Sequence, residues 1–178
     1  MRKIMNTGRA RPGVNTTSAL STGAAEQMRN PLAQGWRIMS TSLAELFVEV
    51  EMVMWKLLLE PDVYVIFHAR EFGNRFVQAV IDDDEEPGIW CETVADTFLG
   101  TPEHGPPMSP TELAALLRDG WLPPSGSPDD TPNWHRLIPA DMPGAPALAS
   151  QLLVSALIDV HNVAYPDQIT VSVGARSR

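Results

Sequence analysis

The chain has 178 residues, 44% of them hydrophobic, and a formal net charge of −9. This length favours one domain with an apolar core, and no apolar run approaches the roughly 18 to 20 residues that a membrane-spanning helix needs. The single cysteine, Cys91, excludes an internal disulfide and suits a reducing cytoplasm, where we expect the protein to act.

The first 35 residues differ from the rest in composition and charge. Residues 1–40 carry six basic side chains and one acidic side chain, whereas the remainder carries seven basic and 21 acidic ones. Because residues 1–35 have no periodic apolar face, we expect a disordered basic leader there and one domain over residues 36–178. The acidic domain makes nucleic acid an unlikely partner. Three alternatives remain open for what the basic leader contacts: RNA, lipid or the chain's own acidic domain. No segment has the pattern of a secretory signal.

The first strong element is the segment "STSLAELFVEVEMVMWKLLLE". Ser42 followed by Glu45 forms a capping-box pattern, which predicts the start of a helix. One broad apolar face recurs at helical spacing: Leu43, Leu46, Phe47, Val50, Met54, Leu57 and Leu58. A second apolar stripe, spaced four, three and four, lies on the far side: Val48, Met52, Trp55 and Leu59. A narrow polar sector between them is predicted for Glu45, Glu49, Lys56 and Glu60.

Two apolar faces are more than a helix on the surface of a monomer needs. Burial of both faces within one subunit, a homodimer contact and a client groove all remain open. Met side chains repack easily, and Trp supplies a large contact area. We therefore predict that the second stripe binds a partner or client through Val48, Met52, Trp55 and Leu59.

The rest of the chain alternates strands and helices. Runs of β-branched and aromatic residues predict strands over residues 63–69, 76–81, 133–139 and 168–175. A further strand is predicted to begin at residue 89. A short helix is predicted after the N-cap Ser109, with Gly120 as the residue that ends it and Trp121 packing back near Leu116. A second long helix is predicted over about residues 147–164. This order predicts an α+β fold, with an antiparallel sheet of about five strands packed against two long helices and one short helix.

Few residues stand out as candidates for chemistry. The acidic run 82–86 lacks the glycine and distal glutamate of a calcium loop, so we interpret it as a solvated turn. Glu92 on an apolar strand suggests a structural hydrogen bond or, alternatively, a general acid used with a histidine brought close by folding. No nucleophile elbow, P-loop or dinucleotide fingerprint occurs. We predict no enzyme activity, no metal site and no cofactor.

Several short motifs resemble the actinobacterial TY-Chap domain, which is related to YbjN proteins and to CesT-like type III secretion chaperones. The matching segments are "NRFVQAVID", "IWCETVADTFL", "LAALLRDGWLPP" and "NW", followed by a long helix, over about residues 36–175. Asp119 replaces the usual Leu before Gly-Trp, and "CETVADTFL" is a loose version of its segment. The motif positions, which we interpret as structural, are Phe76, Gln78, Glu92, Trp121, Asn133 and Trp134.

The resemblance implies a secretion-chaperone-like fold that is often dimeric and binds peptide segments without catalysis. On that basis we expect a non-enzymatic module that binds a client protein segment on apolar helix and sheet surfaces, and a homodimer. The alternative is a small regulatory or structural subunit whose basic tail recruits nucleic acid or a membrane.

Overall fold

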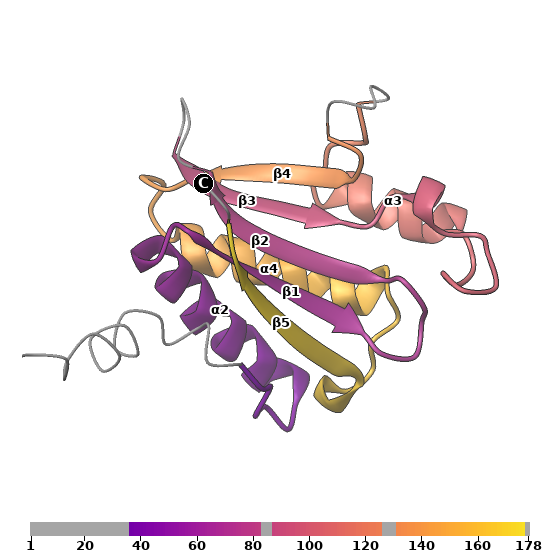
Figure 1. Cartoon of the computed structure of the whole chain (residues 1–178), viewed down its shortest axis with the longest axis horizontal. Helices are drawn as coiled ribbons and strands as arrows, with labels where there is room; N and C mark the ends of the chain where they lie inside the picture. Colours follow the sequence, from indigo (N-terminus) through magenta and orange to yellow (C-terminus); the bar gives the residue numbers. More distant parts are fainter. Residues whose placement is uncertain (1–35, 83–86, 126–130, 177–178) are drawn as a thin grey trace, which may run out of the picture.

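The computed structural model describes residues 36–82, 87–125 and 131–176. The expected α+β fold with a five-stranded antiparallel sheet is confirmed in these ranges (Figure 1). The predicted leader and most of the predicted acidic turn lie outside them. In chain order the elements are α2 (Leu43–Leu59), β1 (Val63–Ala69), β2 (Phe76–Asp82), β3 (Gly88–Thr93), the 3-10 helix η1 (Asp96–Phe98), α3 (Pro110–Arg118), β4 (Trp134–Pro139), α4 (Ala145–Asp159), η2 (Pro166–Gln168) and β5 (Ile169–Ala175).

The sheet has the order β4-β3-β2-β1-β5, and all its neighbouring strands are antiparallel. The first three strands form a meander, as their tight turns predict. The last strand returns to the free side of β1, where Val171 lies opposite Phe67. Figure 1 shows α2 and α4 on one face of this sheet, and the two helices pack against each other.

The core lies between that sheet face and the two helices. Alternate residues of β1, such as Val65 and Phe67, point into it and are fully buried, while Tyr64 and Ile66 on the other face are half-buried. This alternation follows from the two-residue period of a strand. The Ser150 hydroxyl also donates a 2.6 Å hydrogen bond to the carbonyl of Phe47, which ties α4 to α2.

Helix α3 begins and ends as the sequence predicts. At its start, the Ser109 hydroxyl and the Glu112 carboxylate form the expected capping box. At its end, Gly120 adopts a left-handed conformation with φ of 79°, and the Trp121 N–H donates to the Leu116 carbonyl at 3.0 Å. The Trp121 side chain is buried. This hydrogen bond and burial are those of a Schellman motif with its hydrophobic contact.

Helix α4 is shorter than its apolar pattern predicts: it spans Ala145–Asp159, whereas the pattern predicts a helix over about residues 147–164. Asn162 has a φ of 57°, which turns the chain out of the helix, and the Val163 N–H then bonds to the Leu157 carbonyl at 2.9 Å. His161 and Val163 are buried beyond the helix end. Their burial explains why the sequence pattern continued past the true boundary.

Candidate functional site

The second apolar stripe of α2 lies on the surface of the domain. The exposed fractions are 60% for Val48, 50% for Met52, 55% for Trp55 and 81% for Leu59. On the opposite side of the helix, Leu46, Val50, Met54 and Leu57 are fully buried. Among the residues that the structure describes, only one of the two predicted apolar faces is therefore covered. An exposed apolar patch of this kind is typical of an interaction surface.

A groove of about 590 Å³ adjoins the N-terminal half of this stripe. Residues 36–40 form one wall, with Trp36 and Met39 lining it, and Val48 and Met52 of α2 line the other side. Glu45 also borders the groove. The groove and the stripe are thus one continuous surface, since Val48 and Met52 belong to both.

Glu49 holds the wall of the groove in place. Its carboxylate accepts hydrogen bonds from the Met39 N–H at 3.0 Å and from the Ser40 N–H at 2.9 Å, and also from the Ser40 hydroxyl. Glu49, which the sequence places in the narrow polar sector of this helix, is only 7% exposed. Burial of this carboxylate is possible because backbone N–H groups satisfy it.

Lys56 fixes the other end of the same wall. Its ammonium group lies 4.6 Å from the centroid of the Trp36 ring, a cation–π geometry. Because Trp36 lies beside Lys56 and Ser40 lies beside Glu49, residues 36–40 run antiparallel to α2. The described chain therefore enters the domain at the groove.

The stripe has the spacing of a coiled-coil seam. Steps of four, three and four residues place Val48, Met52, Trp55 and Leu59 at alternating a and d positions of a heptad. Such a seam accepts the apolar face of another helix or an apolar extended segment. Acidic residues dominate the rest of the helix, which carries Glu45, Glu49 and Glu51 against the single base Lys56.

Three positions of the family-like motifs make contacts within the fold. Trp121 and Trp134 are buried in the core. Asn133 accepts a 3.3 Å hydrogen bond from the Ala95 N–H through its side-chain oxygen, which joins the start of β4 to the end of β3. None of these three residues lines the groove.

The other three motif positions lie on the sheet face opposite α2. Phe76 is half-buried at the start of β2, where its ring tilts against His68. Gln78 donates a hydrogen bond to the Glu92 carboxylate across β2 and β3. This contact supports the structural interpretation of Glu92 over a free general acid.

Folding does bring a histidine close to Glu92. His135 of β4 lies opposite Glu92 in the strand register, and its ring stacks on Trp90 at a centroid distance of 5.0 Å. A shallow pocket of about 280 Å³ on this face is lined by Trp90 and Glu92, among others. The hydrogen bond between Gln78 and Glu92 and the stacking of His135 on Trp90 are cross-strand contacts of the kind that order side chains on an open sheet face.

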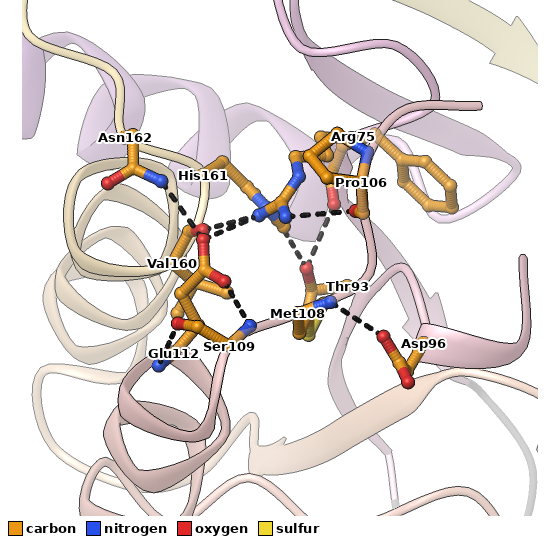
Figure 2. Close-up of polar contacts among 11 residues, drawn as sticks. Arg75, Thr93, Asp96, Pro106, Met108, Ser109, Glu112, Val160, His161 and Asn162 are labelled. Carbon is orange, nitrogen blue, oxygen red and sulfur yellow. Dashed lines mark hydrogen bonds and ion pairs between the residues drawn. The ribbon is translucent and has the colours of Figure 1, made fainter. Parts of the chain in front are cut away.

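A buried polar cluster near α3 has no counterpart among the predicted site residues (Figure 2). Arg75 donates to the Glu112 carboxylate at 2.9 Å and to the Val160 carbonyl at 2.6 Å, and its side chain is only 3% exposed. Asn162 donates to the same Glu112 oxygen at 2.9 Å. Burial opposes ionisation of Glu112, but hydrogen bonds from Ser109 and the charge of Arg75 lower its pKa overall.

His161 completes this cluster. Its Nε2 lies 2.7 Å from the Thr93 hydroxyl, which also donates to the Phe76 carbonyl at 2.9 Å. Burial, together with the charge of Arg75, lowers the pKa of His161 to about 3, so the ring is neutral near pH 7. The cluster joins β2, β3, α3 and the end of α4. The one sequence signal for it was the capping box at Glu112, because the other partners are far apart in the chain.

Neither the helices nor the acidic groups of the described ranges suggest a membrane or metal role. No helix in these ranges has both the length and the apolarity to span a membrane. Within the same ranges, no three His, Cys, Asp or Glu side chains gather in a way that could hold a metal ion.

Comparison with known proteins identifies a family. No curated protein and no solved structure matched the chain. A family model described as TY-Chap3, "T3SS (YopN, CesT) and YbjN peptide-binding chaperone 3", matches residues 29–175. This range includes all the helices and strands described above, so the resemblance expected from the short motifs is confirmed. The chain belongs to the TY-Chap3 family of peptide-binding chaperones.

Proposed function

We propose that this chain is a non-enzymatic chaperone that binds an apolar segment of a client protein on α2. The observation that carries the proposal is the exposed stripe Val48, Met52, Trp55 and Leu59, which continues into the groove. The family description, a peptide-binding chaperone, supports it. We also propose the cytoplasm as its compartment, since the chain's one cysteine is free.

The side chains of this surface favour an adaptable contact. Met39 and Met52 can repack around different apolar side chains, because the thioether chain is unbranched and polarisable. Trp55 offers a large, rigid aromatic surface, the kind of anchor that often dominates binding energy. Glu45 and Glu51 beside the stripe favour a client segment that combines apolar with basic residues.

Self-association is part of the same proposal. An antiparallel pair of α2 helices would place Val48 against Leu59 of a second copy and Met52 against Trp55, as the heptad spacing requires. Because this pairing uses the client surface, a homodimer and a client complex would compete. Light scattering with and without a bound client would separate the two assemblies by mass.

The test is a matched pair of substitutions. Trp55→Glu places a charge in the middle of the stripe at a side chain that is 55% exposed, whereas Leu117→Glu places one on α3 at a side chain that is 60% exposed. Tagged wild type and both variants are used to capture proteins from an extract of the host. Client capture should be lost with Trp55→Glu and kept with Leu117→Glu. Equal capture by all three proteins would contradict the proposal.

A further inference from the structure

We propose that a pocket between α3, β4 and α4 binds a carboxylate group carried by a short apolar body, with Arg136 as the cation that receives it. The pocket has a volume of about 170 Å³, and its lining residues are Asp119, Arg136, Leu148, Gln151, Leu152 and Ser155. None of these residues lines the groove beside α2. This site is therefore separate from the proposed client surface.

Strand β4 holds Arg136 at the pocket. It is an edge strand of the sheet (Figure 1), and its residues Trp134 and Ile138 are buried. Because the side chains of a strand alternate between its faces, Arg136 lies on the same core-facing side as these two residues. Its Nη1 donates a 2.6 Å hydrogen bond to the Asp119 carbonyl at the end of α3. This contact satisfies one of the free carbonyls at the helix end and fixes the guanidinium in the pocket wall.

Arg136 is the base at this pocket that no carboxylate occupies. The Asp119 carboxylate also borders the pocket, but Arg118 donates to both its oxygens, at 2.7 and 3.1 Å, and to Asp159 at 2.8 Å. In the described ranges, by contrast, Arg136 takes part in no ion pair. A guanidinium has several N–H donors, and the Asp119 carbonyl uses only one of its nitrogens. Arg136 therefore keeps donors and a positive charge for a bound anion.

Helix α4 supplies two further polar groups and the apolar wall. Gln151 and Ser155 are four positions apart, so both lie on one side of the helix. Neither side chain has a hydrogen-bond partner in the part of the chain that the structure describes. The buried Leu152 and the half-buried Leu148 line the same pocket. The pocket thus combines a cation, an amide and a hydroxyl with a short apolar surface.

This combination matches a carboxylate. A carboxylate is planar, and its two oxygens fit the N–H fork of a guanidinium. The Gln151 amide and the Ser155 hydroxyl can donate to the same oxygens, while Leu148 and Leu152 contact the hydrocarbon part. Because the pocket is small, that hydrocarbon part is short, as in butyrate or in the last residue of a peptide with a free C-terminus.

The first experiment titrates the full-length protein with butyrate and, as the matched control, with butyramide, which has a similar shape without the charge. Binding is followed by NMR through the side-chain amide of Gln151 and through the backbone amide of Gly120, which lies against the Arg136 guanidinium. Butyrate should shift both signals with a Kd of about 1 mM. Butyramide should bind about tenfold more weakly, because it cannot form a charge-assisted pair with Arg136.

A second arm decides which kind of molecule carries the carboxylate. The peptide acetyl-Gly-Ala-Val is titrated with a free C-terminus and as its C-terminal amide. Tighter binding of the free-ended peptide than of butyrate assigns the site to a chain end, and tighter binding of butyrate assigns it to a free acid. The inference is overturned if neither acid shifts the two signals, or if each acid binds no better than its amide.

Two variants and a control test the residues themselves. Arg136→Gln removes the cation, and Ser155→Leu fills the pocket while Arg136 stays in place. Both should weaken binding of the tighter acid by about tenfold, whereas Arg70→Gln removes an exposed base just after β1 and should leave the affinity unchanged. Thermal unfolding shows whether the Arg136 variant is folded, and if it is not, Ser155→Leu decides alone. Unchanged affinity in Ser155→Leu, or equal weakening in Arg70→Gln, overturns the inference.

Discussion

The Arg75 guanidinium and the Glu112 carboxylate form an ion pair at 2.9 Å inside the domain, 37 positions apart in the chain. The pair fixes α3 to the sheet and to the end of α4, since Arg75 also binds the Val160 carbonyl. The groove lies on α2 and contains neither residue. Stability and client binding should therefore respond to different substitutions.

Arg75→Met should destabilise the domain by about 3–5 kcal/mol, because it leaves the Glu112 carboxylate partly buried without its cation. Urea denaturation, followed by tryptophan fluorescence, measures the change. The double variant Arg75→Met, Glu112→Leu should recover part of the loss, since no buried charge remains. A double variant that is less stable than Arg75→Met alone would contradict this account of the pair.

Acid should destabilise the fold through His161. Its pKa is near 6.5 in an unfolded chain and about 3 in the folded protein, so between these values the unfolded state binds a proton that the folded state does not. The contribution of His161 is full above about pH 6.5 and is lost as the pH falls towards 3, by up to about 1.4 kcal/mol per pH unit. The lowered pKa of Glu112 acts in the same direction.

Unfolding free energies measured from pH 7 to pH 4 test this dependence. His161→Gln removes the titrating group, so its stability should fall less steeply with pH than that of the wild type, even if it is lower at pH 7. Identical slopes for the two proteins would show that His161 does not titrate as the structure indicates.

Gly120→Ala should destabilise the domain by about 1–2 kcal/mol, because the left-handed φ of 79° is unfavourable for a residue with a Cβ. An added Cβ would also lie 3.0 Å from Nη1 of Arg136. Gly120→Asn is the matched control, since Asn tolerates this conformation better, and its loss of stability in thermal unfolding should be smaller. A larger loss for Asn than for Ala would point to crowding by Arg136 in place of backbone strain.

Cys91 should be unreactive in the folded protein. The thiol is fully buried in β3, and burial raises its pKa to about 12, so almost no thiolate exists at pH 7. A thiol reagent that releases a coloured product should react with it only after unfolding in urea. Rapid reaction of the native protein would show that β3 opens to solvent.

Local patterns predicted much of the fold. The capping box at Ser109 and the Gly120 turn depend on residues within a few positions of each other, and both occur as predicted. The second stripe of α2 was also visible from spacing alone, whereas the exposure of Trp55 came only with the structure, because the spacing left burial within one subunit open. These features need no knowledge of which segments meet in space.

Features made by distant segments were not predictable in the same way. The helix pattern places Glu49 in a polar sector but contains no sign that residues 36–40 fold over it. The meeting of Arg75 with His161 and Glu112 depends on the sheet order and on the early end of α4. Burial of polar groups at long sequence separation requires the tertiary structure.

The most direct test of client binding is photo-crosslinking in the host at two positions. A photoreactive phenylalanine analogue replaces Met52 in the stripe or, as the control, Tyr64 on the opposite sheet face, and the crosslinked peptides are identified by mass spectrometry. The account predicts that Met52 crosslinks to apolar segments of a client protein, distinguishable by mass from crosslinks within the chain, and that Tyr64 does not. Client crosslinks from Tyr64 with none from Met52 would contradict it.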